Sequence, residues 1–135
     1  MGAYSLLAAI YPAQHVYYLE NGVFAKDFKK LNLDFPYDDG GENNWDFTGN
    51  NFQWHKCGDF SCLSAYKTYK NGVYGLQVYF EEHADQNTYA GEIICFADFD
   101  DNALEMCKFL GYSNTPFASG TPTRRIGKIK YYKKL

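Results

Sequence analysis

The sequence of 135 residues lacks a long apolar run. The longest run near its start, Leu6 to Tyr11, is far shorter than the roughly 20 residues that a helix needs to cross a bilayer. A signal peptide, with its basic, apolar and small-residue regions, is not visible either. These absences leave two alternatives, a cytosolic protein or one from which an upstream segment has been removed.

A strong excess of charge is also absent, because 13 basic residues stand against 16 acidic ones and the net charge is −3. Nucleic acid and anionic membranes are therefore not expected as partners. The acids gather between residues 34 and 46, and the bases between residues 124 and 134. We interpret these clusters as solvated surfaces or as charged strand edges, which resist pairing with other chains.

Catalytic motifs are missing as well. The three histidines, His15, His55 and His83, are scattered, and there is no H-E-x-x-H, G-x-S-x-G or phosphate-binding loop. A cysteine nucleophile at Cys57, near His55, would need a geometry that nearness in sequence does not provide. We therefore predict that the protein is not an enzyme.

Aromatic residues, in contrast, are abundant, with 13 Tyr and 11 Phe. Tyrosine suits the half-buried surface of a sheet better than it suits a helix. A chain of this length folds as one domain around one core. We therefore predict a single α+β domain over residues 1–135, rich in β-structure, in which a helix packs on an antiparallel sheet.

The stretch from residue 3 to residue 22 predicts an amphipathic helix. Pro12 lies inside it and should either kink it or mark its beginning, because an interior proline costs about 3 kcal/mol. Asn21-Gly22 should end the helix in the left-handed conformation. The residues expected to pack against the sheet, or beside that packing face, are Leu6, Leu7, Ile10, Tyr11, Ala13, Tyr17 and Tyr18.

The stretch from residue 37 to residue 59 combines acids, Gly and Asn with aromatic residues. It is too long for an ordinary connection, so we predict an ordered surface loop with aromatic anchors, or a strand pair inside it. Trp45 and Trp54 could form a ligand-binding surface there. Aromatic residues in a core or in a subunit contact are the alternative interpretation of both tryptophans.

The sequence Lys70-Asn71-Gly72-Val73 predicts a two-residue turn centred on Asn71 and Gly72, and hence a hairpin over residues 63–80. The register set by this turn sorts the side chains into one apolar and one mixed face. Residues 92–111 predict a buried strand followed by a helix that Gly111 ends. Residues 113–123 have turn composition, and residues 126–133 predict a last edge strand.

Four cysteines allow three pairings. Cys57 and Cys62 are close in sequence, and Cys95 in its strand should lie near Cys107 in the helix that follows. We predict the disulfides Cys57–Cys62 and Cys95–Cys107, which persist only in an oxidising compartment. A zinc site is the alternative, but the eleven residues between Cys95 and Cys107 are not the spacing of a zinc knuckle.

Four side chains around the start of the second helix could coordinate calcium: Asp98, Asp100, Asn102 and Glu105. The loop lacks the glycine and the spaced glutamate of an EF-hand. Capping of the helix and stabilisation of its dipole explain these side chains with fewer assumptions. We therefore expect no cofactor, with calcium at these residues as the alternative.

Two parts of the sequence share the pattern of a known family. The first is a proline-containing helix with Gln14, Tyr17-Tyr18 and Glu20-Asn21-Gly22, followed by Phe24. The second is a strand carrying Cys95, an acidic turn, a helix carrying Cys107, and then Leu110-Gly111. These parts resemble the soluble domain of bacterial type IV pilins and type II secretion pseudopilins. The middle of the chain, about residues 37–90, matches no motif of that family.

The resemblance implies a helical spine covered by an antiparallel sheet, with a disulfide that closes a loop near the end of the chain. It also implies export to the periplasm or the bacterial cell surface and polymerisation with other subunits of the same filament. A hydrophobic half-helix ahead of Ala3, which this sequence does not contain, would anchor the subunit in the inner membrane before assembly. The alternative is a secreted β-rich module that binds a carbohydrate or another surface ligand through Trp45, Trp54 and neighbouring tyrosines.

Overall fold

The fold is given by a computed structural model. It describes residues 2–26, 28–31, 33, 37–40, 47–49, 51–56, 61–81, 88–121 and 127–135. No helix within these ranges is long and apolar enough to cross a membrane.

Two α-helices, one short 3-10 helix and eight strands make up the described part of the chain. In chain order they are α1 (Ala3–Asn21), η1 (Phe28–Leu31), β1 (Tyr37–Gly40), β2 (Phe47–Gly49), β3 (Phe52–Lys56), β4 (Cys62–Tyr69), β5 (Gly72–Tyr79), β6 (Ile93–Ala97), α2 (Asp101–Phe109), β7 (Ala118–Gly120) and β8 (Ile129–Tyr132).

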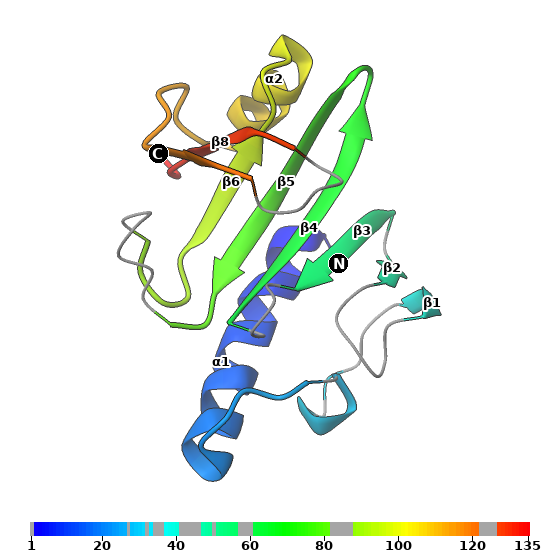
Figure 1. The fold of residues 1–135 in the computed structure, drawn as a ribbon, viewed down its shortest axis with the longest axis vertical. Helices are drawn as coiled ribbons and strands as arrows, with labels where there is room; N and C mark the ends of the chain where they lie inside the picture. Colours follow the sequence, from blue (N-terminus) through cyan, green and yellow to red (C-terminus); the bar gives the residue numbers. More distant parts are fainter. Residues whose placement is uncertain are drawn as a thin grey trace.

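The strands form one sheet in the order β1-β2-β3-β4-β5-β6-β8-β7, and every neighbouring pair is antiparallel. Figure 1 shows α1 behind the central strands and α2 at one end of β5 and β6. Both helices contribute to one apolar core together with the strands. The prediction of an α+β fold, with the N-terminal helix packed on an antiparallel sheet, is confirmed.

The other face of the sheet carries a second buried cluster. Tyr79 of β5 hydrogen-bonds through its side chain with Tyr131 of β8, although β6 lies between these strands. Figure 1 shows β8 crossing in front of β6. The members of the cluster are Cys62, Tyr66, Tyr79, Ile94, Phe96, Ile129 and Tyr131.

Helix α1 is continuous from Ala3 to Asn21, so Pro12 lies inside it and does not begin it. Gly22 ends the helix with a φ of 76°, as the sequence predicts. The buried face is formed by Ala3, Leu6, Leu7, Ile10 and Gln14. Three of the predicted packing residues, Tyr11, Ala13 and Tyr17, lie partly buried at its border. Tyr18 is 43% exposed near the end of the helix, where its ring lies 4.8 Å from that of Phe24.

The hairpin of β4 and β5 confirms the predicted 63–80 element but not its register. Tyr69 pairs with Gly72, so the turn consists of Lys70, with a φ of 56°, and Asn71. Each predicted pair is displaced by two residues, which leaves every side chain on its predicted face. The core-facing side chains of the two strands include Leu63, Ala65, Leu76 and Val78.

Gly72 is placed by packing rather than by the turn. A Cβ atom at this position would lie 2.9 Å from the Cβ atoms of Ala103 and Asp100. The backbone N–H of Val73 donates to Oδ2 of Asp98 at 3.0 Å, and the N–H of Asp98 donates to the Val73 carbonyl at 3.0 Å. The start of β5 is therefore held directly against the start of α2.

The stretch 37–59 contains strands β1, β2 and β3, so its description as a long loop is wrong and the strand alternative holds. The β2–β3 hairpin pairs Phe47 with Trp54. Trp54 is 2% exposed and belongs to the core, so it cannot stack on a surface ligand. Trp45 lies outside the described residues.

In the C-terminal third, strand β6 and helix α2 match the prediction, but the predicted edge strand is not at the edge of the sheet. All of β6 is buried, and α2 follows it. The predicted edge strand exists as β8, but β7 pairs with its outer side, so β8 is internal and the turn prediction for 113–123 is wrong at Ala118–Gly120. Cys95 and Cys107 form the predicted disulfide between β6 and α2.

Candidate functional site

The surface of α1 that faces away from the sheet is mostly apolar, with Ser5, His15 and Glu20 as exposed polar residues. Glu20 is the helix's only acidic or basic residue apart from His15, because the sequence of α1 contains no Asp, Lys or Arg. A helix that is apolar on all sides is normally buried on all sides. The exposed residues of this outer face include Ala8, Ala9, Pro12, Val16 and Leu19.

Three large apolar side chains are exposed at the end of this region. Val16 is 52% exposed, Leu19 is 70% exposed, and Val23, just after the helix, is 57% exposed. Val16 and Leu19 are three positions apart and therefore neighbours on the helix surface. We call Val16, Leu19 and Val23 the outer stripe of α1. Clustered apolar exposure of this kind marks interaction surfaces more often than single exposed residues do.

A buried hydrogen-bonding side chain fixes the chain that leaves α1. Gln14 is fully buried, its Oε1 accepts from the Ala25 N–H at 2.8 Å, and its Nε2 donates to the Ala25 carbonyl at 3.1 Å. Nearby, the ring of Tyr18 lies 4.8 Å from that of Phe24, which in turn lies 5.7 Å from Phe80. The outer stripe is therefore carried by a helix end that is fastened to the body of the domain.

A groove of about 340 Å³ lies beside the outer stripe. It separates α1 from η1 and combines apolar walls with one carboxylate and one ammonium group. Its described lining residues are Ala13, Val16, Tyr17, Glu20, Lys30 and Leu31.

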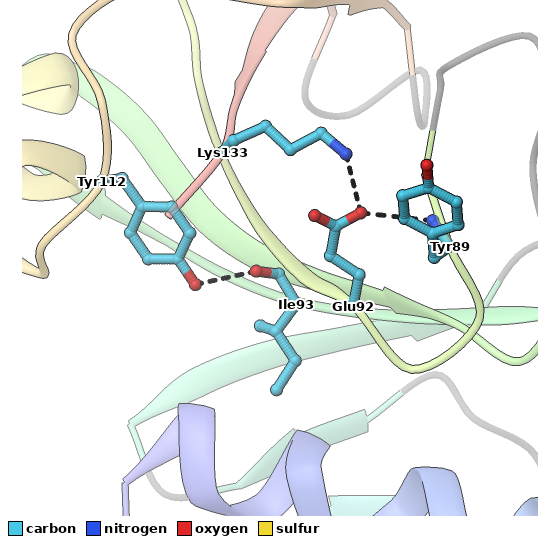
Figure 2. A network of polar contacts seen from close by, with 5 residues as sticks. All are labelled: Tyr89, Glu92, Ile93, Tyr112 and Lys133. Atoms are coloured by element: carbon cyan, nitrogen blue, oxygen red, sulfur yellow. Dashed lines mark hydrogen bonds and ion pairs between the residues drawn. The ribbon is translucent and has the colours of Figure 1, made fainter. Parts of the chain in front are cut away.

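The C-terminal segment is tied down by a polar network, which Figure 2 shows. Oε1 of Glu92 accepts from Lys133 Nζ at 2.7 Å and from the Tyr89 N–H at 3.2 Å. The hydroxyl of Tyr112 donates to the Ile93 carbonyl at 3.0 Å. These contacts join the end of the chain to the residues that lead into β6.

Burial gives the tyrosines of this region unusual acidities. The pKa of Tyr112 is raised well above its ordinary value, chiefly because burial penalises the phenolate, and secondarily by the nearby Tyr4 and Glu92. Burial raises the pKa of Tyr132 as well. Lys134 places its Nζ 4.0 Å from the centre of the Tyr4 ring, which links the C-terminal tail to the first turn of α1.

Two of the four candidate calcium ligands, Asp98 and Asp100, accept hydrogen bonds from the backbone. Asp98 Oδ1 accepts from the Asp100 N–H at 3.1 Å, and Asp100 Oδ1 accepts from the Asn102 N–H at 2.8 Å. Asp100 is the N-cap of α2. Glu105 pairs with Lys108 at 3.0 Å. Among the described residues, no three His, Cys, Asp or Glu side chains gather as they would around a metal ion.

The remaining candidate residues are only partly placed. Cys62 is buried and disulfide-bonded. Cys57, its predicted partner, lies outside the described residues, so that pairing stays a prediction. His15 is exposed on α1 and stacks beside Tyr11, with ring centroids 6.0 Å apart. His83 lies outside the described residues.

Comparisons with family models, with curated proteins and with solved structures found no match for this chain. The resemblance to pilins therefore depends on the residues quoted for it in the sequence.

The outer stripe was not recognised in the sequence, although its spacing was readable there. The amphipathic interpretation of α1 identified the residues of one apolar face and named none on the opposite, exposed side. The scarcity of charge over the whole of Ala3–Asn21 was the missed signal, because an exposed helix face is normally polar. Gln14 was missed for a different reason, since a buried amide looks like a surface residue until its partner is known.

Proposed function

We propose that the chain is a non-catalytic structural subunit of an extracellular type IV pilus or pseudopilus filament and that it assembles through α1. The observation that carries the proposal is the scarcity of charge on α1 together with the exposed apolar side chains of its outer stripe. One side is covered by the sheet of its own domain, and the outer stripe is covered by neighbouring subunits of the filament.

The disulfide supports the same proposal, because it indicates an oxidising compartment. Both Cys95 and Cys107 are inaccessible to solvent, and their bond fixes α2 to β6. Such bonds persist outside the reducing cytosol, which agrees with assembly in the periplasm or at the cell surface.

The alternative function, a secreted module that binds a carbohydrate through Trp45 and Trp54, is weakened. Trp54 is a core residue, as its 2% exposure requires. The partners that we propose are therefore other subunits of the same filament, with membrane contact only through a helix upstream of Ala3.

Site-specific photo-crosslinking in whole cells tests the proposal. A benzophenone amino acid at position 19, in the full-length protein in its own host, should give a ladder of subunit multimers. Position 109 is the matched control, because Phe109 is 84% exposed on the other α-helix. We expect several-fold fewer multimers from position 109. Equal ladders at both positions, or none at position 19, would contradict assembly through the outer stripe.

A further inference from the structure

Helix α2 buries little apolar surface against the sheet. Of its nine residues, only Ala103 and Cys107 are buried, and the side chain of Ala103 is a single methyl group. Leu104 and Met106 are only partly buried against the core, and Phe109 is 84% exposed. The packing of an apolar face supplies most of the stability of a helix in a protein. Packing alone therefore holds α2 weakly.

The chain is fastened to the sheet on both sides of α2. Before the helix, Asp98 Oδ2 accepts from the Val73 N–H at 3.0 Å, and the Asp98 N–H donates to the Val73 carbonyl at 3.0 Å. After the helix, Tyr112 is 2% exposed, and its hydroxyl donates to the Ile93 carbonyl at 3.0 Å. The segment between Asp98 and Tyr112 can therefore leave the sheet while both of these anchors stay in place.

Between the two anchors, one covalent bond joins α2 to the sheet. Cys107 of α2 is linked to Cys95 of β6, and both residues are 0% exposed. A reductant therefore reaches the sulfur atoms only when this part of the domain opens. A helix of nine residues is marginal in water by itself, so α2 has no reason to stay helical once it has left the sheet.

We propose that the bond between Cys95 and Cys107 is a redox-sensitive latch for α2. With the bond in place, α2 stays on β5 and β6. With two thiols in its place, the segment between Asp98 and Tyr112 opens about a hundredfold more often, which is the effect expected from closing a loop of this length. The rest of the sheet stays folded during this opening.

The latch closes when the two thiols pass two electrons and two protons to a disulfide oxidant, which becomes two thiols. It opens when a thiolate of a dithiol reductant attacks one sulfur atom and displaces the other as a thiolate, which takes up a proton. The second thiol of the reductant then breaks this mixed disulfide, frees the second cysteine as a thiol and leaves the reductant as a disulfide. This inference rests on the contacts of α2 and does not depend on the filament proposal.

Amide hydrogen exchange at several urea concentrations tests the proposal. The chain carries Cys57→Ala and Cys62→Ala, so that dithiothreitol reduces only the bond under test. We expect the amides from Leu104 to Lys108 to exchange about a hundredfold faster in the reduced form, with little dependence on urea. The amides of Leu76 and Val78 in β5 should exchange more slowly than those of α2. They should keep a steep dependence on urea, because they exchange only when the whole domain unfolds.

A second variant, Cys95→Ala/Cys107→Ala, keeps the other two cysteines and should show the pattern of the reduced form without any reductant. The proposal is overturned if reduction leaves the exchange of α2 unchanged, because the other contacts of α2 then hold it without the bond. It is also overturned if α2 and β5 in the reduced form exchange at the same rate with the same urea dependence. In that case α2 leaves the sheet only when the whole domain unfolds.

Discussion

Gln14 joins α1 to the segment that follows it through a side chain that no solvent reaches. Its amide accepts from and donates to the backbone of Ala25, as a neighbouring strand would. A buried backbone group normally has a partner, so this amide does for Ala25 what a sheet ladder does elsewhere. This residue therefore fixes the chain that leaves α1 against the helix.

Replacing Gln14 by Leu keeps a side chain of similar size in the buried position but removes both hydrogen bonds to Ala25. Because a buried group that loses its partner costs about 1–3 kcal/mol, we expect the free energy of unfolding to fall by about 2–4 kcal/mol in urea titrations. Glu20→Ala, on the exposed surface of the same helix, should change it by less than about 0.5 kcal/mol. A Gln14→Leu variant as stable as the original would show that this amide contributes nothing.

At this scale the sequence predicts residues whose role depends on their neighbours in the chain, and misses those whose role depends on distant ones. Gly22 ends α1 as predicted, because a left-handed cap is a local requirement. Gly72 was assigned to the turn, yet it is required by the approach of Ala103, thirty-one positions later. Trp54 is in the core because its strand lies inside the sheet between β2 and β4, which its sequence context does not reveal.

At the scale of elements, α2 and β6 form a unit that two kinds of contact hold in place. The disulfide joins α2 to β6, and Asp98, between them, hydrogen-bonds to β5. The two cysteines are separated by 12 positions. Closing a loop of this length restricts the unfolded chain and should stabilise the fold by about 3 kcal/mol in the loop-entropy account.

The double variant Cys95→Ala/Cys107→Ala should therefore lose about 3 kcal/mol of stability, somewhat more if the small alanines leave a cavity. Thermal and urea unfolding of the oxidised proteins measure the difference. The double variant keeps Cys57 and Cys62, so any other disulfide stays intact. No loss of stability would mean that the contacts of α2 with β5 hold this unit without the bond.

The elements themselves were predictable where their pattern is long. α1, the β4–β5 hairpin and the β6–α2 unit each have a clear period or turn signal. Strands β2 and β7 have only three residues each, too few to show an alternation. The hairpin register was wrong by two residues because the close contact of Gly72 with α2 outweighed the local preference of Asn-Gly for a turn centre.

At the scale of the whole molecule, buried tyrosines make stability depend on pH. Burial raises the pKa of Tyr74, Tyr79, Tyr112 and Tyr132 in the folded protein. Below about pH 10 both the folded and the unfolded chain keep the phenol protons. Above it the unfolded chain releases protons first, so the free energy of unfolding falls as pH rises.

Each such tyrosine should contribute a slope of up to about 1.4 kcal/mol per pH unit above pH 10. Urea unfolding between about pH 8 and pH 12 measures the slope, and phenolate absorbance should show a fraction that ionises only on unfolding. Tyr112→Phe should lower stability near neutral pH, because the bond to Ile93 is lost, and should flatten the alkaline slope. A slope equal to that of the original protein would show that Tyr112 ionises freely in the folded state.

The outer stripe of α1 is apolar and exposed in the single domain. Our central proposal is that other subunits of a filament cover this stripe. The most direct measurement is the count of surface filaments, by electron microscopy, on host cells that produce the full-length protein with Leu19→Asp. The matched variant is Phe109→Asp, which adds the same charge at an exposed apolar position of α2. Urea unfolding of both purified domains confirms that each is folded. The account predicts filaments with Phe109→Asp and none with Leu19→Asp; normal filaments with Leu19→Asp would contradict it.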